Sequence, residues 1–328
     1  MTGQPENHVK IITDDRVQQL LSETRAVDVL EQAFRDFSDQ VITMGDRGFL
    51  KVGEHQDPCI FLPASHKKEE FFSIKYAASF ALGGEKEIPT VQSVIWLFSA
   101  KTGEVFAMIH AGFLTAVKTG AASAVAARHL SNPNARILTI IGAGEQAKYQ
   151  ISCIARVRDL TEIRLVDLDP EKSRNLKAWV LTRLEKPVSV QIHSSADTAV
   201  PDADIIVTCT TSNRPVLDGR QLKSGSHVNA IGSFTPEMQE IDIHTIQRAH
   251  SIVTDSIAET KKYAGDLILP MQQGIVPKNI QMVELGDVIT GKSRGRTDAG
   301  QITLYESIGF SPLDLALAIE VYRRHSPI

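Results

Sequence analysis

The chain has 328 residues, of which 42% are hydrophobic and 23% charged, which is enough for two domains with cores of their own. Its formal net charge of −4 gives no overall attraction to nucleic acid or to an acidic membrane surface, and no apolar run approaches the roughly 20 residues that cross a bilayer. Residues 1–10 are polar and lack the apolar core of a signal peptide. Three widely spaced cysteines without a CxxC pair argue against a disulfide framework and a metal site. These features predict a cytoplasmic protein without nucleic-acid or membrane partners.

The first part of the chain predicts two helices. Asp14 and Asp15 could cap a brief helix, and apolar residues between Ala26 and Phe37 recur at the spacing of a helix with one buried face.

From about Val41 to His110 the pattern becomes that of a mostly antiparallel sheet. Short apolar segments are separated by Gly, Pro and charged turns, and Lys101–Glu104 predicts a hairpin turn. Cys59, which follows Pro58, is expected in a loop. The small residues of Leu114–Leu130 then predict a helix, and Ser131–Asn134 breaks the chain.

Beyond Leu130, strand and helix patterns alternate. ILTIIGAG is typical of a strand buried on both faces, a helix is expected from about Glu145, and the strand EIRLVDL and a helix from Pro170 follow. SVQIHSS, DIIVTCT, SHVNAIG and SIVTDS predict further strands. Such alternation indicates an α/β fold with a parallel sheet and helices on both faces. Residues 285–300 are expected to form a loop, and a helix over Leu313–Arg323 is expected to pack on the first domain.

A dinucleotide-binding motif lies directly after the first of these strands. Gly142, Ala143, Gly144, Glu145, Gln146 and Ala147 form GxGxxA, in which the glycines allow a tight turn and close approach of a pyrophosphate to a helix N-terminus. Asp167 ends the next strand, where a carboxylate accepts hydrogen bonds from the ribose hydroxyls and repels a 2′-phosphate. The motif predicts NAD as cofactor. Arg164 and Lys172, close by in sequence, leave NADP open.

Several stretches resemble the ornithine cyclodeaminase/μ-crystallin family in shared order and spacing. They are LTAVKTGAASAVAARHL, IIGAGEQA, SHVNAIGSFTPEMQEID, AGDL, ELGDVITG and ITLYESIGFSPLDLALA. The resemblance implies a Rossmann dinucleotide-binding domain over residues 131–304. It also implies an α+β substrate-binding and dimerisation domain over residues 1–130 and 305–328. Family members are usually homodimers.

The resemblance also implies roles for single residues. Arg47, Lys75 and Lys118 stand where the family holds the substrate carboxylate, and Lys75 is the expected catalytic residue. The alternation of Ile74, Lys75 and Tyr76 would point Lys75 to the face opposite its neighbours. The other expected contacts are Thr90 and Phe234 with the substrate, and Thr119, Thr210, Gly232 and Ser233 with the cofactor.

Two departures from the family pattern bear on the reaction. Lys118 replaces an arginine, so a point charge replaces a planar bidentate donor. Phe234 and Met238 stand where ornithine cyclodeaminases carry an aspartate and a lysine. Because phenylalanine can neither take a proton nor pair with an ammonium group, it suits an apolar ring instead.

The leading hypothesis is therefore reduction of a small cyclic ketimine carboxylate, such as Δ1-pyrroline-2-carboxylate, to L-proline with NADH or NADPH. Lys75 or a bound water would supply the proton. Three alternatives stay open: ornithine cyclodeaminase, an alanine or other amino-acid dehydrogenase, and a μ-crystallin-like protein that binds the dinucleotide without turnover.

Overall fold

The chain folds into two compact units. The structure, a computed structural model, describes residues 9–55, 57–80 and 91–325. Unit 1 comprises Met1–Lys118 and Ser311–Ile328, and unit 2 comprises Thr119–Phe310. The sequence placed the two divisions near residues 130 and 305, and the roles that it assigned to the two domains remain predictions.

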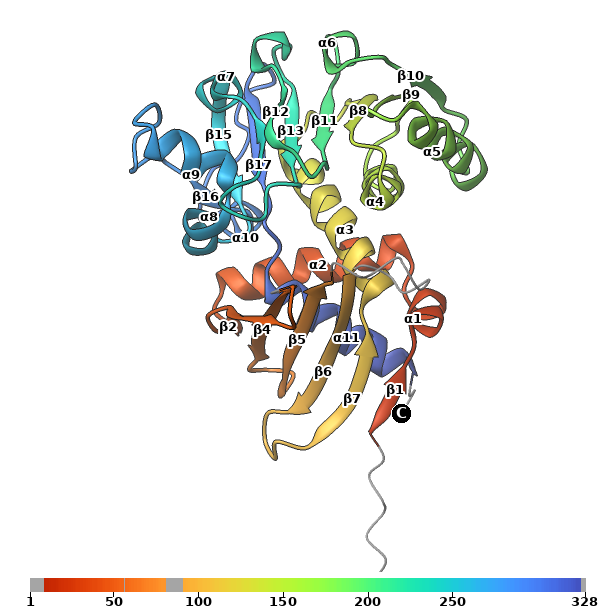
Figure 1. Cartoon of the computed structure of the whole chain (residues 1–328), viewed down its shortest axis with the longest axis vertical. Helices are drawn as coiled ribbons and strands as arrows, with labels where there is room; N and C mark the ends of the chain where they lie inside the picture. The colour runs from red at the N-terminus through yellow and green to blue at the C-terminus, as the bar shows by residue number, and fades with distance from the viewer. Residues whose placement is uncertain (1–8, 56, 81–90, 326–328) are drawn as a thin grey trace, which may run out of the picture. The chain divides into compact units, whose positions relative to one another are not determined.

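Unit 1 contains a twisted sheet (Figure 1) whose pairings are antiparallel except that of β1 with β7. The described strands follow the order β1-β7-β6-β5-β4-β2, and β3 also pairs with β4. A hairpin at Gly103, whose φ is +75°, joins β6 to β7, so the predicted antiparallel sheet and its turn are confirmed. The strands are β1 (Lys10–Ile12), β2 (Ile42–Met44), β3 (Gly48–Val52), β4 (Asp57–His66), β5 (Phe71–Ser79), β6 (Val91–Ser99) and β7 (Val105–His110).

Helices α2 (Glu23–Ser38) and α11 (Ser311–His325) cover one face of this sheet. α2 buries the stripe that the sequence predicted, including Ala26, Leu30 and Phe34, because residues three and four apart share a helix face. α11 packs on α2 and on β4, β5 and β6. The prediction that the C-terminal helix returns to the first domain is thus confirmed.

Two details of unit 1 correct the sequence interpretation. Helix α1 (Asp14–Leu20) begins after Thr13, so Asp14 and Asp15 lie in its first turn rather than at its cap. The Asp14 carboxylate instead accepts a hydrogen bond from the Phe113 N–H at 3.0 Å, at the start of α3 (Gly112–Leu130). Cys59 lies within β4 and is buried, not in a loop, because its alternate position faces the core.

Unit 2 contains an entirely parallel sheet in the order β10-β9-β8-β11-β13-β17-β15-β16. The chain passes from β8 to β9 on one side and reaches β11 on the other side of β8, which is the topological switch point at which such sheets bind ligands. This confirms the predicted Rossmann-like α/β fold. The strands are β8 (Ile137–Ile141), β9 (Glu162–Val166), β10 (Ser189–Ile192), β11 (Ile205–Thr208), β13 (His227–Ala230), β15 (Ala249–Thr254), β16 (Val283–Glu284) and β17 (Ile302–Glu306).

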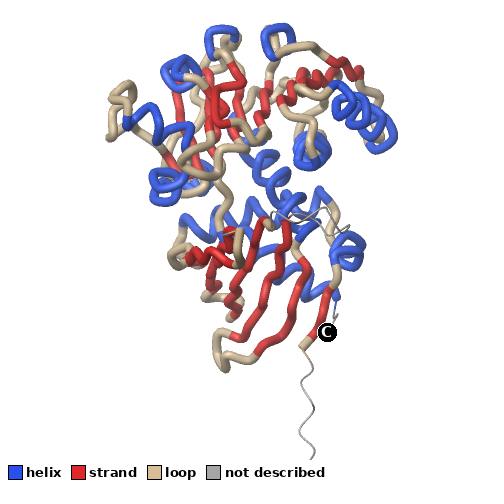
Figure 2. The backbone as a smooth tube through the Cα atoms, in the orientation of Figure 1, coloured by secondary structure: helices blue, strands red, loops and turns tan. Residues whose placement is uncertain are grey.

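Helices flank both faces of the unit 2 sheet (Figure 2). Neighbouring residues of β13 show this: the Asn229 amide donates to the Ser123 carbonyl of α3, whereas Val228 joins the core cluster that contains Ile246 of α7 and Leu267 of α9. The other helices of unit 2 are α4 (Glu145–Ile154), α5 (Pro170–Arg183), α6 (Ala196–Ala199), α7 (Ile243–Arg248), α8 (Ile257–Tyr263), α9 (Gly265–Gln272) and α10 (Leu285–Thr290).

Several short elements were not predicted. β12 (Asn213–Leu217) and β14 (Gln239–Ile241) form a separate parallel pair. Residues 285–300, expected as a loop, begin with α10, whose C-cap Gly291 adopts the left-handed conformation. Among the described residues, no helix combines the length and the apolar character that a membrane crossing requires.

Candidate functional site

Three charged groups meet in the interior of unit 1. β5 places Lys75 on its buried face, where 3% of the residue is exposed, while Ile74 and Tyr76 point the other way, as the alternation predicted. The Lys75 ammonium donates to the Thr115 hydroxyl at 2.7 Å and to the Asp314 carboxylate at 2.9 Å. The other Asp314 oxygen accepts from Lys118 at 2.8 Å. Two buried ammonium groups therefore share one carboxylate, and together they keep a net positive charge.

The protonation of this cluster is set by burial and by mutual attraction. Burial lowers the pKa of Lys75 to about 8; Lys118 and Arg47 act in the same direction, and Asp314 opposes them. Burial alone would raise the pKa of Asp314, but Lys118 and Lys75 hold it below its usual value. The cluster is a buried cationic site of the kind that attracts a carboxylate.

The sequence found the cations but missed their partner. Lys75 and Lys118 are buried, so the alternative that they are solvated surface charges is wrong. Arg47, between β2 and β3, is half-buried and close enough to affect Lys75. Thr90 lies outside the described residues. Asp314 lies in the segment SPLDLALA, on the buried face of the predicted C-terminal helix. Because acidic residues are almost never fully buried unless paired, this position was the signal in the sequence that a cation lies opposite it.

In unit 2, the predicted glycine turn joins β8 to α4. Gly142 has a φ of +100°, and a Cβ there would lie 2.8 Å from the Cys209 carbonyl oxygen, so both conformation and space require glycine. Gly144 is the N-cap of α4, and a Cβ on it would meet no atom within 4 Å. The turn therefore presents open space at a helix N-terminus, where backbone N–H groups and the helix dipole favour an anion.

Asp167 lies beside this turn. Its carboxylate accepts hydrogen bonds from the Ala143 N–H at 2.6 Å and from the Asp169 N–H at 2.8 Å. Arg164 points elsewhere, because its guanidinium is bound to Glu162 and to the carbonyls of Ala199 and Pro201. A carboxylate beside the turn, without Arg164 near it, favours a ribose hydroxyl over a 2′-phosphate.

A buried glutamate, which the sequence reasoning missed, connects the ends of β11 and β13. Glu240 is fully buried and accepts four hydrogen bonds. They come from the Thr210 N–H (2.5 Å), the Thr210 hydroxyl (2.7 Å), the Thr208 hydroxyl (2.9 Å) and the Gly232 N–H (2.6 Å). Burial raises the pKa of Glu240, although these hydrogen bonds oppose it. The predicted cofactor residues Thr210 and Gly232 are thus held by one carboxylate.

The remaining predicted residues of unit 2 lie around the same loop or on α3. The Ser233 hydroxyl donates to the Met238 carbonyl at 2.8 Å and accepts from the Asp266 N–H at 3.1 Å. Phe234 is 48% exposed. Thr119 is half-buried on α3, and a Cβ on the next residue, Gly120, would collide with the Tyr149 carbonyl of α4.

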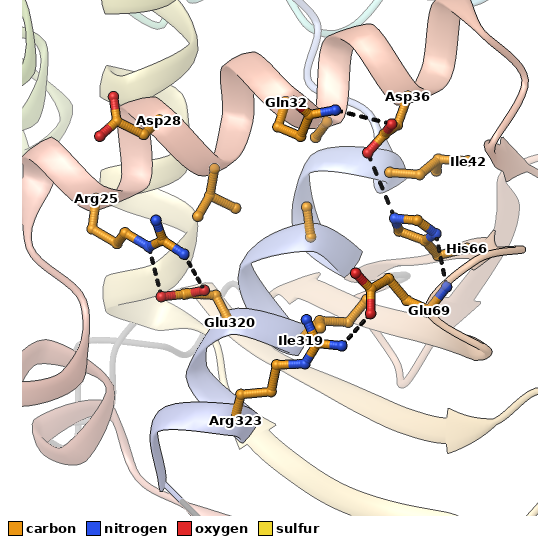
Figure 3. A pocket seen from close by; sticks show the side chains of 13 residues that line it. Arg25, Asp28, Gln32, Asp36, Ile42, His66, Glu69, Ile319, Glu320 and Arg323 are labelled. Carbon is orange, nitrogen blue, oxygen red and sulfur yellow. Dashed lines mark hydrogen bonds and ion pairs between the residues drawn. The ribbon is translucent and has the colours of Figure 1, made fainter. Parts of the chain in front are cut away.

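A groove of about 240 Å³ lies elsewhere in unit 1, between α2 and α11 (Figure 3), and the predicted site residues do not line it. Its arginines face carboxylates across the groove: Arg25 binds Glu320 at 2.7 Å, and Arg323 binds Glu69. These pairs are a structural link between α2, α11 and the β4–β5 turn, and they do not form a binding site for an anion.

Comparisons with known proteins give the family. The model of the ornithine cyclodeaminase/mu-crystallin family matches residues 7–327. A Delta(1)-pyrroline-2-carboxylate reductase from Bacillus thuringiensis subsp. konkukian is 31% identical over 314 residues, which cover 96% of each chain.

Solved structures of enzymes with bound NADH or NAD are similar to this chain over nearly its whole length. The Delta(1)-pyrroline-2-carboxylate reductase of Thermococcus litoralis, in complex with NADH and L-proline, has a TM-score of 0.90 at 27% identity and 96% coverage of both chains. An archaeal alanine dehydrogenase dimer with bound NAD has a TM-score of 0.89 at 28% identity, with 96% of this chain and 95% of that chain covered. The chain belongs to the ornithine cyclodeaminase/mu-crystallin family.

Proposed function

We propose that the protein is an NAD(H)-dependent reductase of a small cyclic imine carboxylate such as Δ1-pyrroline-2-carboxylate, with L-proline as the product. The observation that carries this proposal is that two buried lysines, Lys75 and Lys118, share the single carboxylate of Asp314. The three groups together keep a net positive charge, and such a site attracts the carboxylate of a substrate. Similarity to pyrroline-2-carboxylate reductases over 96% of the chain supports the same reaction.

The residues present fit a dinucleotide. The open space at Gly144 and the first turn of α4 would take the pyrophosphate, and Asp167 would take the ribose hydroxyls. Thr119, Ala143, Glu145, Gln146, Ala147, Thr210, Gly232 and Ser233 stay proposed contacts of the same cofactor. The nicotinamide of NADH supplies a hydride to the imine carbon when it is bound.

Most of the side chains that we propose to act on the substrate belong to unit 1, whereas Phe234 belongs to unit 2. Lys75, Lys118 and Arg47 would hold the carboxylate, and Thr90 and Phe234 would contact the rest of the substrate. The overall change is imine plus NADH plus one proton giving amine plus NAD⁺. Lys75, with a pKa of about 8, carries a proton that it can release near neutral pH and is therefore the proposed donor, with bound water as its alternative.

A direct assay tests the proposal. Purified protein is mixed with pyrroline-2-carboxylate and NADH or NADPH, and nicotinamide absorbance is followed. We expect oxidation of the dinucleotide in proportion to proline formed, with NADH preferred because of Asp167. Absence of oxidation with either dinucleotide would overturn the proposal.

The same assay separates the alternatives within the family. A cyclodeaminase converts ornithine to proline and ammonia without net change in NADH, and an alanine dehydrogenase requires ammonia with pyruvate. Phe234, where an acid would assist cyclodeamination, argues against the first. A dinucleotide-binding protein without activity would bind NADH yet reduce no imine.

We also propose that the protein is a cytoplasmic homodimer. The face of the unit 1 sheet opposite α2 and α11 carries an apolar row: Ile11, Met108, Trp96 and Ile74 lie in one register across β1, β7, β6 and β5, and Ile11 is 62% and Trp96 37% exposed. An apolar row of this kind is typical of a subunit interface. Three free cysteines, of which Cys59 and Cys153 are buried, suit a reducing compartment.

A further inference from the structure

The parallel sheet of unit 2 has two halves, one on each side of its switch point. β8, β9 and β10 form the first half, which carries the glycine turn and Asp167, and β11 and β13 begin the second. In a Rossmann sheet each half takes one nucleotide, and the carboxylate after the second strand binds the ribose of the adenosine. The segments that follow β11 and β13 are therefore the ones that would receive the nicotinamide half of the dinucleotide.

The glycine turn packs directly against the segment that follows β11. A Cβ on Gly142 would lie 2.8 Å from the Cys209 carbonyl oxygen and 2.9 Å from the Thr210 methyl group. A Cβ on Gly232, after β13, would collide with the Thr210 carbonyl and would lie 2.6 Å from Oε2 of Glu240. Thr210 is thus packed between two glycines that have no room for a side chain, and a movement of Thr210 would alter this end of the second half.

Glu240 fixes the segments after β11 and β13 through both of its oxygens. Oε1 accepts from the Thr210 N–H at 2.5 Å, and Oε2 accepts from the Gly232 N–H at 2.6 Å. A backbone N–H can only donate. A carboxylate therefore satisfies both groups, whereas the amide of a glutamine would place its NH₂ against one of them. The geometry calls for a glutamate at this position and not merely for a polar side chain of the same size.

The contacts of Glu240 also set it apart from the acids near it. Burial raises the pKa of Glu240, and its four hydrogen bonds oppose that rise. Two buried acids are its neighbours: Asp266, whose Oδ1 accepts from the Glu240 N–H at 2.6 Å, and Glu306. Oδ2 of Asp266 and both carboxylate oxygens of Glu306 have no hydrogen-bond partner among the described residues. Because donors on both oxygens favour the charged form, Glu240 is the acid of the three that is best placed to be ionised.

We infer that Glu240 is a positioning residue for the nicotinamide half of the dinucleotide, which it serves by fixing Thr210 and Gly232 at the ends of β11 and β13. The inference rests on the dinucleotide part of the proposed function and not on the identity of the imine. The glycine turn has anchors of its own, since the Gly142 N–H donates to the Val166 carbonyl at 2.8 Å and the Ala143 N–H donates to Asp167. Loss of Glu240 should therefore affect the second half more than the first.

The experiment compares Glu240→Gln and Glu240→Ala with wild type in the absence of any imine. Calorimetry gives Kd for NADH and for ADP, which carries the adenosine and the two phosphates but lacks the nicotinamide half. Hydrogen exchange over residues 208–212 and 230–233, without ligand, reports the two segments directly. Asp204→Ala is the matched control, because Asp204 also accepts two backbone N–H groups, from Arg136 at 2.7 Å and Ile137 at 2.9 Å, but does so at the opposite edge of the sheet.

We expect both Glu240 variants to raise Kd for NADH about tenfold or more, the usual effect of losing a hydrogen bond to a charged group. Kd for ADP should stay within about twofold of the wild-type value, as expected for a site with independent contacts. Exchange should increase in both segments in the Glu240 variants, and Asp204→Ala should change neither exchange there nor the ratio of the two Kd values.

Equal weakening of NADH and ADP by the Glu240 variants would overturn the inference, because a general loss of structure would then explain it. Increased exchange with an unchanged Kd for NADH would overturn it as well, and so would a wild type that binds no NADH. A wild type that binds NADH but reduces no imine would contradict only the proposed reaction, and the comparison of NADH with ADP would still decide the role of Glu240.

Discussion

Asp314 is the residue on which the cationic site of unit 1 depends. It is fully buried and accepts one hydrogen bond from each of two lysines. Removing a charged group from water costs several kcal/mol, which attraction within the pair repays only when the geometry is complete. The three charges therefore behave as one group, and loss of the carboxylate leaves two buried ammonium groups without compensation.

Asp314→Asn tests this dependence. We expect the free energy of unfolding to fall by about 3–5 kcal/mol, the usual effect of removing one partner of a buried pair, and the pKa of Lys75 to fall below its present value because the attraction of Asp314 is lost. Urea unfolding and the pH dependence of KM measure the two effects.

The control for this variant is Asp159→Asn. Asp159 also lies between two cations, Lys186 at 2.8 Å and Arg136 at 3.9 Å, but at the surface. Screening by solvent makes such pairs weak, so the urea midpoint should stay close to that of wild type. Equal destabilisation by the two substitutions would show that burial of Asp314 is unimportant.

The pH dependence of substrate binding follows from Lys75. Its pKa is lowered from 10.5 to about 8, so it is charged below pH 8 and neutral above. We expect KM for the imine carboxylate to rise as pH increases through 8, while KM for NADH stays constant. Initial rates between pH 6 and 10 measure both, and a constant imine KM across this range would contradict the assignment.

The same shift has a defined effect on stability. Between about pH 8 and 10.5 the unfolded chain binds the Lys75 proton and the folded chain does not, so this group raises the free energy of unfolding as pH rises through that interval.

At the residue scale, the sequence identified groups whose position follows from local pattern. Strand alternation predicted the direction of Lys75, and the GxGxxA motif predicted Gly142 and Gly144. Asp314 could not be assigned to Lys75, because the two are 239 residues apart and nothing local indicates that α11 packs beneath β5. Glu240 and Asp266 were missed for the same reason.

Among the elements, the C-terminal end of α3 shows how a helix can be ended by a distant side chain. The Arg158 guanidinium donates to the carbonyls of Ala127 at 2.7 Å, Arg128 at 3.0 Å and Ser131 at 3.2 Å, and to the Ser131 hydroxyl at 2.8 Å. The last carbonyls of a helix lack partners within the helix. Here Arg158 binds those of Ala127 and Arg128, and Arg296 binds that of Leu130 at 2.6 Å. Burial lowers the pKa of Arg158, which nonetheless stays a cation at neutral pH.

Arg158→Met should therefore destabilise unit 2. We expect the free energy of unfolding to fall by roughly 2–3 kcal/mol, since buried acceptors lose a charged donor. Chemical denaturation followed by circular dichroism measures it. Arg174→Met is the control, because Arg174 is exposed and pairs with Glu171, which lies three residues earlier in α5; a comparable loss there would indicate a nonspecific effect of removing an arginine.

The elements that the sequence predicted are α2, with its periodic apolar stripe, α3, with its long run of small residues, and strands such as β8 and β11, which are unbroken apolar runs. Those it missed are short: α6 has four residues and α7 six, and β14 has three. Segments this short contain less than two helical turns, or less than two repeats of a strand, so they show no hydrophobic periodicity from which an element could be predicted. Their conformation is decided by packing on the sheet, as for α7 and α9 against Val228 and Leu304.

For the whole molecule, the apolar row on the face of the unit 1 sheet opposite α2 and α11 predicts self-association. Trp96→Glu places a charge in the apolar register row described above, and we expect a homodimer to become a monomer because an unpaired charge cannot be buried at an interface core. Sedimentation velocity at micromolar protein measures the change.

Leu181→Glu is the control for dimer formation. Leu181 is 56% exposed and lies on α5, a helix of unit 2. The same charge there should leave the sedimentation coefficient unaltered. A wild-type monomer, or a Trp96→Glu dimer, would remove the support for this interface.

The sharing of Asp314 between Lys75 and Lys118 also constrains how the protein matures on the ribosome. Both lysines are synthesised before the 192 residues of unit 2, and their counter-ion emerges only afterwards. A nascent chain therefore exposes the amino-terminal sheet with two uncompensated ammonium groups until α11 docks. A chain that ends before Ser311 would keep both lysines of unit 1 and lack the carboxylate that compensates them.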